Sequence, residues 1–245
     1  MVAGIATTNS LPAGIRMADT DTLALSRLLQ LASPLLPVGA YSYSQGLEWA
    51  IEAGTVVDAD SALLWIGDAM QLSLCRFELP ILWRLRQCWE QGDDEGLARW
   101  NRLWCAGRDN AEARAETLQM GYSLARLLNE LNALDAQAGE RLRGVTPASF
   151  PLAYAVAASV WFIDAEKAQH AYAWSWAENQ VSAALKAVPL GQVAGQRLLL
   201  ALGSRIADAV TMARTLDDDE ISNFAPGLAL AGCLHETQYS RLFRS

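Results

Sequence analysis

Apolar residues recur at helical spacing along almost the whole chain, and this periodicity limits the possible folds more than any other feature. Between positions 58 and 77 they follow at intervals of three and four residues, which places them on one face of a helix. Runs of alternating Val, Ile and Thr, which are typical of strands, are missing. The sequence therefore predicts an all-α fold. The stripe consists of Leu63, Ile66, Met70, Leu74 and Phe77.

Caps, prolines and glycines divide the chain into about ten helices. The connections between them are short, so we expect a single-domain bundle whose neighbouring helices are mostly antiparallel. We expect Pro80 to kink or restart its helix, because proline has no N–H to donate. A turn is expected at 139–144, and Thr146 with Pro147 should open the next helix. The expected helices cover about 20–31, 44–54, 58–91, 93–105, 109–131, 147–163, 164–188, 191–215 and 226–243.

The first residues differ from the rest of the chain. Residues 1–18 are mostly small and have neither the charged start nor the apolar stretch of a secretory signal. They predict a flexible N-terminal tail, with Met17 as an alternative start, followed by one all-helical domain over 19–245. The four cysteines match no zinc or redox spacing and predict reduced thiols in a cytoplasmic protein.

Two further observations bear on the surroundings of the protein. A formal net charge of −8 argues against nucleic acids and anionic membranes as partners. Residues 144–163 carry no charge, but Pro151 interrupts them and alanine is the commonest of their apolar residues. We therefore expect a buried helix there rather than a membrane span.

Motifs of common enzyme classes are missing. The chain has no phosphate-binding loop, no GxSxG, no HExxH and no GxGxxG, and only two histidines. Glu166 and His170 are one helical turn apart and could share a metal, which leaves a helical metal-dependent enzyme as the alternative. Cys233 with His235 is a weaker metal pair, and the acidic run at 217–220 is typical of a solvated turn. We predict a non-enzyme without a cofactor.

Two stretches fit a core poorly and predict protein–protein contacts. Residues 36–48 combine tyrosines with glycines and serines, and residues 235–245 place large apolar groups between arginines at a chain end. We expect the tyrosine loop to face a partner rather than fill the core. We expect a docking segment at about 226–245, loosely packed or disordered in the isolated protein, although folding back onto the body is the alternative. The candidate partner-binding residues are Tyr41, Tyr43, Glu48, His235, Tyr239, Arg241, Leu242, Phe243 and Arg244.

Five blocks carry a resemblance to a known family. In order they are LPVGAYSYSQGLE at 36–48, RAETLQMG at 114–121, YAWSWAENQVSAA at 172–184, VPLGQ at 188–192 and HETQYSRLFRS at 235–245. From about residue 21 to the end, the sequence resembles the UreF family of urease accessory proteins. The resemblance implies an all-helical, cytoplasmic homodimer without catalytic activity, and the small and aromatic residues around 172–184 and 192–202 suggest its dimer faces.

The resemblance also implies partners. They are the accessory protein UreD (also called UreH), the GTPase UreG and the urease apoprotein, to which the complex helps deliver nickel. On this basis we expect the loop with Tyr41 and Tyr43 to contact UreG and the C-terminal segment to dock on UreD. A helical scaffold for unrelated partners remains the further alternative.

Overall fold

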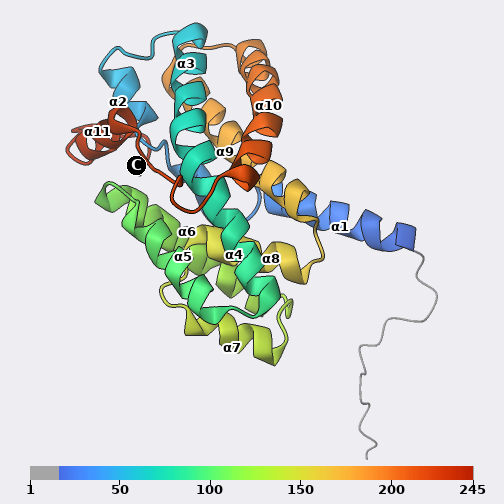
Figure 1. The fold of residues 1–245 in the computed structure, drawn as a ribbon. Coiled ribbons are helices and arrows are strands. Elements are labelled where there is room, and N and C mark those ends of the chain that lie inside the picture. Colours follow the sequence, from blue (N-terminus) through green and yellow to red (C-terminus); the bar gives the residue numbers. More distant parts are fainter. Residues whose placement is uncertain (1–16, 245) are drawn as a thin grey trace, which may run out of the picture.

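The computed structural model describes residues 17–244, and their regular elements are helical throughout (Figure 1). Eleven α-helices, a 3₁₀ turn and a π-helical stretch form this described part, which confirms the predicted all-α bundle. Their bounds are α1 Met17–Ala32, η1 Ala40–Ser42, α2 Leu47–Glu52, α3 Ala59–Ala69, η2 Met70–Glu78, α4 Leu79–Gln91, α5 Asp94–Ala106, α6 Ala111–Glu130, α7 Ala136–Gly144, α8 Phe150–Val160, α9 Ala165–Ala187, α10 Gln192–Thr215 and α11 Pro226–His235.

The longest feature is a continuous rod formed by α3, η2 and α4 (Figure 1). Asp58 caps its start through a reciprocal pair of hydrogen bonds with Ser61. The restart that we expected at Pro80 is confirmed, because α4 begins at Leu79 with Pro80 in its first turn, directly after the wider π-helical turns of η2. Pro80 has no N–H for the carbonyl of Arg76, and that carbonyl instead accepts the Ser222 N–H at 3.1 Å. A distant segment thus supplies one hydrogen bond that allows the rod to continue.

Helices α8 and α9 form the centre of the bundle. α8 packs between α4 and α6, and α9 lies against α10, α1 and α2. Eight successive residues of α8, at 151–158, are buried, as expected for the uncharged run. α9 forms a hairpin with α10, and α4 forms another with α5, so chain neighbours are antiparallel where loops are short. Among the helices that the structure describes, none is long and apolar enough to cross a membrane.

Three expected boundaries were wrong. The turn predicted at 139–144 forms the last two thirds of α7, whose start Asp135 caps by accepting the Ala138 N–H. The following helix does not begin at Thr146 and Pro147 but at Phe150, where Ser149 is the cap. The last helix ends at His235 rather than near residue 243, and the chain continues as an irregular segment to Arg244.

The predicted tail falls mostly outside the described residues. Positions 1–16 of the tail, together with Met1 as a start, lie there, whereas Met17 already begins α1. α9 shows a second difference from expectation, because most of the residues proposed as a dimer face at 172–184 are buried within the chain itself. On α10, in contrast, Val193 and Leu200 remain exposed, seven residues apart and on one face.

Candidate functional site

The structure brings the predicted partner-binding residues together from three distant parts of the chain. Tyr41 and Tyr43 lie in and after η1, Glu48 lies in α2, and the other residues lie at the end of α11 and in the segment that follows. α2 and α11 lie side by side (Figure 1). Gly46 makes this approach possible, because a Cβ there would lie 3.0 Å from the backbone nitrogen of Gly232. The C-terminal segment then reaches η1, where the Arg244 N–H donates to the Ser42 carbonyl at 2.8 Å.

The carboxylate of Glu48 holds the C-terminal segment on the body. The side chain is buried, and its Oε1 accepts the Leu242 N–H at 2.6 Å. Its Oε2 accepts the Phe243 N–H at 3.0 Å and lies 3.1 Å from Nε2 of His235. A buried carboxylate is costly unless several donors surround it, and three are present here. Glu48 thus fixes the path of the last residues.

His235 connects Glu48 to a second carboxylate. The ring is fully buried, and its Nδ1 lies 2.7 Å from Oε2 of Glu112 in α6. Carboxylate oxygens only accept, so both ring contacts are hydrogen bonds at once only when both nitrogens carry a proton. Arg241 donates to the other oxygen of Glu112 at 2.5 Å. We call Glu48, Glu112, His235, Arg241, Leu242 and Phe243 the C-terminal clasp.

The clasp corrects part of the sequence-based prediction. The C-terminal segment is not loosely packed, because Phe243 is 7 % exposed and joins the core beside Lys186. Phe243 therefore folds back onto the body of the protein, which was the alternative expectation for this segment. Leu242, in contrast, is 71 % exposed, and Tyr239 is fully exposed.

The two tyrosines of the loop also lie in different environments. Tyr43 is buried in the core, and its carbonyl accepts an amide N–H of Asn179, so the expectation that it faces a partner was wrong. Tyr41 is half-buried, and its hydroxyl donates to Glu178 at 2.7 Å. Burial, together with this hydrogen bond and the charge of Glu178, raises the pKa of Tyr41 well above its ordinary value. Tyr41 therefore stays a neutral phenol that is held in one orientation.

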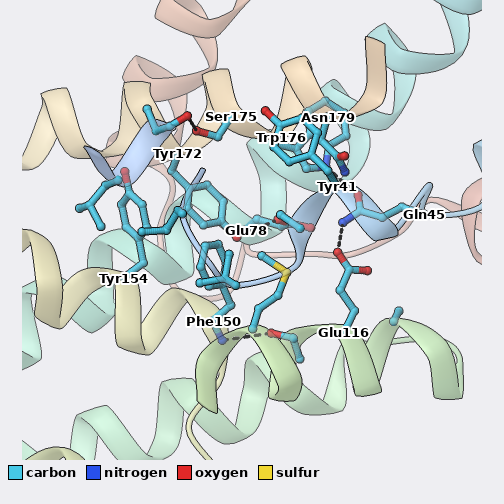
Figure 2. A pocket seen from close by; sticks show the side chains of 18 of the residues that line it. Tyr41, Gln45, Glu78, Glu116, Phe150, Tyr154, Tyr172, Ser175, Trp176 and Asn179 are labelled. Carbon is cyan, nitrogen blue, oxygen red and sulfur yellow. Dashed lines mark hydrogen bonds between the residues drawn. The ribbon is translucent and has the colours of Figure 1, made fainter. Parts of the chain in front are cut away.

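Beside Tyr41 the bundle contains a cavity of about 80 Å³, which opens to solvent on one side. Figure 2 shows the carboxylates of Glu78 and Glu116 pointing into it from two sides. Glu78 pairs with Arg108 at 3.1 Å. Gln45 links two walls, since its Nε2 donates to Glu116 at 2.8 Å and its Oε1 accepts the Trp176 ring N–H at 2.7 Å. We call this space the central cavity.

The sequence analysis missed Glu112 of the clasp and the polar residues of the central cavity. Gln45 and Glu116 lie within the blocks at 36–48 and 114–121, but nothing in their spacing indicated that they would meet. Glu78 lies in the π-helical stretch, whose apolar stripe predicts a core-facing helix and does not indicate a buried carboxylate. The signal that could have found them is a charged residue at a helix position whose neighbours are core residues.

The metal pairs considered from sequence do not form a site. Glu166 pairs with Arg214 instead of His170, which is exposed. Cys233 points its sulfur toward the Asp109 carbonyl at 3.9 Å, whereas His235 lies in the clasp. Within residues 17–244, no group of three or more His, Cys, Asp or Glu side chains is arranged to hold a metal ion.

Comparison with known proteins gives a consistent family. The family model described as UreF matches residues 56–203. A protein of Methylobacillus flagellatus named urease accessory protein UreF is 58 % identical over 222 residues, which cover 91 % of this chain and 98 % of the relative. Proteins of the same name from Azoarcus sp. and Dechloromonas aromatica are 57 % and 52 % identical, each over 91 % of this chain, with 96 % and 98 % of their own lengths covered. On this similarity and its helical fold, the chain belongs to the UreF family of urease accessory proteins.

Proposed function

We propose that this accessory protein works as a non-catalytic bridge that binds UreD (UreH) and the GTPase UreG and assists nickel insertion into urease apoprotein in the cytoplasm. The observation that carries the proposal is that the C-terminal clasp joins two stretches that the sequence marks as interaction surfaces. Arg244 contacts the loop of Tyr41, while Tyr239 and Leu242 project outward from the same segment. Two partners could thus bind adjacent parts of one surface.

The UreD contact is proposed for the outer face of the C-terminal segment. Leu242 and Tyr239 are exposed although they are large and partly apolar, and aromatic residues are typical anchors of interfaces. Burying a leucine side chain contributes about 1.5–3 kcal/mol. Glu48 and His235 hold the segment in place from beneath and contribute to docking through its shape.

The UreG contact is proposed for the neighbouring surface around Tyr41. Its hydroxyl is fixed by Glu178, and a preorganised side chain loses little freedom on binding. Tyr43 supports this loop from the core and does not contact the partner. A homodimer is proposed through the exposed face of α10 with Val193 and Leu200, since the α9 face is already buried within the chain.

The test is co-purification with separately tagged UreD and UreG. Leu242→Asp is expected to retain the melting temperature and to weaken UreD binding by roughly 10- to 100-fold, the equivalent of losing one buried leucine. The matched control is Leu64→Asp on α3, where the leucine is similarly exposed at 65 %. Equal UreD binding by Leu242→Asp and the unchanged protein would exclude this docking face.

A second variant separates the two partners. Tyr41→Ala is expected to reduce UreG recruitment while UreD still binds, because the C-terminal segment remains held by Glu48. Loss of UreD binding together with UreG binding would contradict separate contacts. The alternative, a metal-dependent enzyme, would need the carboxylate of Glu166 as a metal ligand, but that carboxylate is already paired with Arg214.

A further inference from the structure

The imidazole ring of His235 lies where three elements meet, and it contacts a carboxylate at each of its two nitrogens. The side chain, at the end of α11, is fully buried. Its Nδ1 lies 2.7 Å from Oε2 of Glu112 in α6, and its Nε2 lies 3.1 Å from Oε2 of Glu48 in α2. Both separations are hydrogen-bond distances. The number of protons on this one ring therefore decides whether both contacts are favourable.

A neutral imidazole can satisfy only one of the two carboxylates. It carries a single N–H, and its other nitrogen is an acceptor with a lone pair. Because a carboxylate oxygen is also an acceptor, two lone pairs would face each other at one end of the ring. In the doubly protonated ring each nitrogen donates to one carboxylate, and such hydrogen bonds between charged groups are the strong ones. The observed geometry therefore fits a ring that carries both protons.

The charges of the clasp balance in the same state. Glu48 and Glu112 each contribute one negative charge, and Arg241 contributes one positive charge through its 2.5 Å contact with Glu112. A doubly protonated His235 adds the second positive charge and brings the sum of these four side chains to zero. A neutral ring leaves the group with an excess of negative charge. Such an excess is costly in a buried place, so loss of the proton weakens the closed clasp.

The other ionisable groups around the ring have their contacts elsewhere. Glu236, the next residue in the chain, accepts the first N–H of α6 at 2.7 Å. Glu116, one turn along α6 from the ring's carboxylate partner, accepts an amide N–H of Gln45 at 2.8 Å. The sulfur of Cys233 points to the backbone carbonyl of Asp109 at 3.9 Å. The charge of the ring therefore acts mainly on the two carboxylates that it touches.

Glu48 couples the ring to the end of the C-terminal segment. The carboxylate oxygen that meets the ring also accepts the Phe243 N–H at 3.0 Å, and the other oxygen accepts the Leu242 N–H at 2.6 Å. Repulsion at the ring displaces this carboxylate and so weakens both backbone hydrogen bonds. Lys186 of α9, which lies 5.3 Å from the centre of the Phe243 ring, is the cation on the far side of the segment. One proton on the ring thus bears on the path of several residues.

We propose that the C-terminal clasp is a proton-operated latch, which holds residues 241–244 on the body while His235 carries two ring protons and loosens when the pH rises and the ring loses one of them. The direction is fixed by the two carboxylates, since they favour the charged ring. Leu242 points outward only while the segment is held, so partner docking on it should weaken in the same direction. That consequence rests on the proposed function, whereas the latch itself does not.

The experiment follows the full chain, without partners, from about pH 6 to about pH 9, an interval that covers the charge change of histidine side chains while carboxylates stay ionised. Hydrogen-exchange protection, taken relative to the unfolded chain at the same pH, is expected to fall by roughly 10- to 100-fold at the amides of Leu242 and Phe243 but not in α8. The ¹⁵N resonances of the His235 ring should show two protonated nitrogens at the lower pH and the loss of one proton as the protection falls. Constant protection at the two amides, or a ring with one proton while the segment is held, would overturn the latch.

Two variants with matched controls assign the pH step to the ring. His235→Gln should loosen the segment at every pH and remove the step, whereas His170→Gln, at the exposed second histidine of the chain, should keep it. Glu112→Gln leaves the ring in place, and its amide can turn to accept from a protonated nitrogen or donate to an unprotonated one, so the step should largely disappear. Glu236→Gln removes a carboxylate that does not touch the ring and should keep the full step.

A full step in either His235→Gln or Glu112→Gln would show that another group controls the segment and would overturn the latch. If His235→Gln fails to fold, Glu112→Gln and the ¹⁵N resonances of the unchanged protein still decide. Because no partner is present, the failure of the latch and the failure of UreD docking are separate results. Protection that is constant over the pH range excludes the latch alone, whereas normal UreD binding by Leu242→Asp excludes the docking face alone.

Discussion

Replacing Glu48 with glutamine is expected to release the C-terminal segment while leaving most of the bundle folded. Glutamine has nearly the same shape but offers one acceptor oxygen and an NH₂ group, which is itself a donor. One of the two backbone N–H groups, of Leu242 or Phe243, then faces another donor, and His235 loses its negative partner. Hydrogen bonds to a charged group contribute about 1.5–3 kcal/mol each, and Glu48→Gln removes one such bond and the charge that strengthens the others. We expect the segment to lose about 3 kcal/mol of local stability.

Hydrogen exchange measures this loss directly. A loss of about 3 kcal/mol corresponds to roughly a 100-fold faster exchange of the amides of Leu242, Phe243 and Arg244, whose N–H groups are hydrogen-bonded in the intact protein. The control is Glu52→Gln, which removes an exposed carboxylate from the same helix. Amides in α8 should be protected equally in all three proteins. If Glu48→Gln leaves exchange at Leu242 and Phe243 unchanged, the carboxylate does not hold the segment and the clasp is not its anchor.

Three further outcomes follow from other parts of the structure. Gly121→Ala should lower the free energy of unfolding by about 1–3 kcal/mol in a denaturant titration, because its Cβ would lie 2.2 Å from the Ala148 carbonyl oxygen, whereas Gly227→Ala, with open space around it, should not. At pH 8 a thiol reagent should modify exposed Cys233 first, while Cys88, whose pKa burial and Asp93 raise to about 11, should react only on unfolding. Hydrogen bonds from Ser61 hold the pKa of Asp58 below its ordinary 3.8, so the stabilisation by this cap is present above pH 3.8 and is lost as the pH falls through the lower folded-state pKa. The melting-temperature difference between the unchanged protein and Asp58→Ala should therefore shrink below that pH, and a constant difference would contradict it.

Local signals in the sequence were sufficient to predict the helices whose stability depends on residues close together along the chain. The stripe before position 78 and the cap at Asp58 lie within a few residues of each other, and Ile66, Met70, Leu74 and Phe77 are buried as expected. Pro80 shows the limit of such reasoning. The hydrogen bond that its missing N–H leaves open is supplied by Ser222, which is far away in the sequence.

The candidate site was predictable in its residues but not in its connections. Residue type and spacing marked Glu48 and His235 as members of unusual stretches, but they are 187 positions apart and no periodicity links them. Glu112, which completes the clasp, lies in the first turn of α6, where an acidic residue is common because it favours the positive end of the helix dipole. Glu48, Glu112 and His235 meet only because α2, α6 and α11 pack together. That packing cannot be read from a single sequence.

The last residues show why partner docking and folding back could not be separated from composition. Read as a continuing helix, Leu242 and Phe243 belong to one apolar end and are expected to share one environment. The helix ends at His235, and in the irregular segment that follows the two neighbours point to different sides: Phe243 into the core and Leu242 outward. Glu48 enforces this division because it binds the backbone N–H groups of both residues and so fixes where each side chain points. One segment can therefore hold itself on the body with one residue and offer the next residue to a partner.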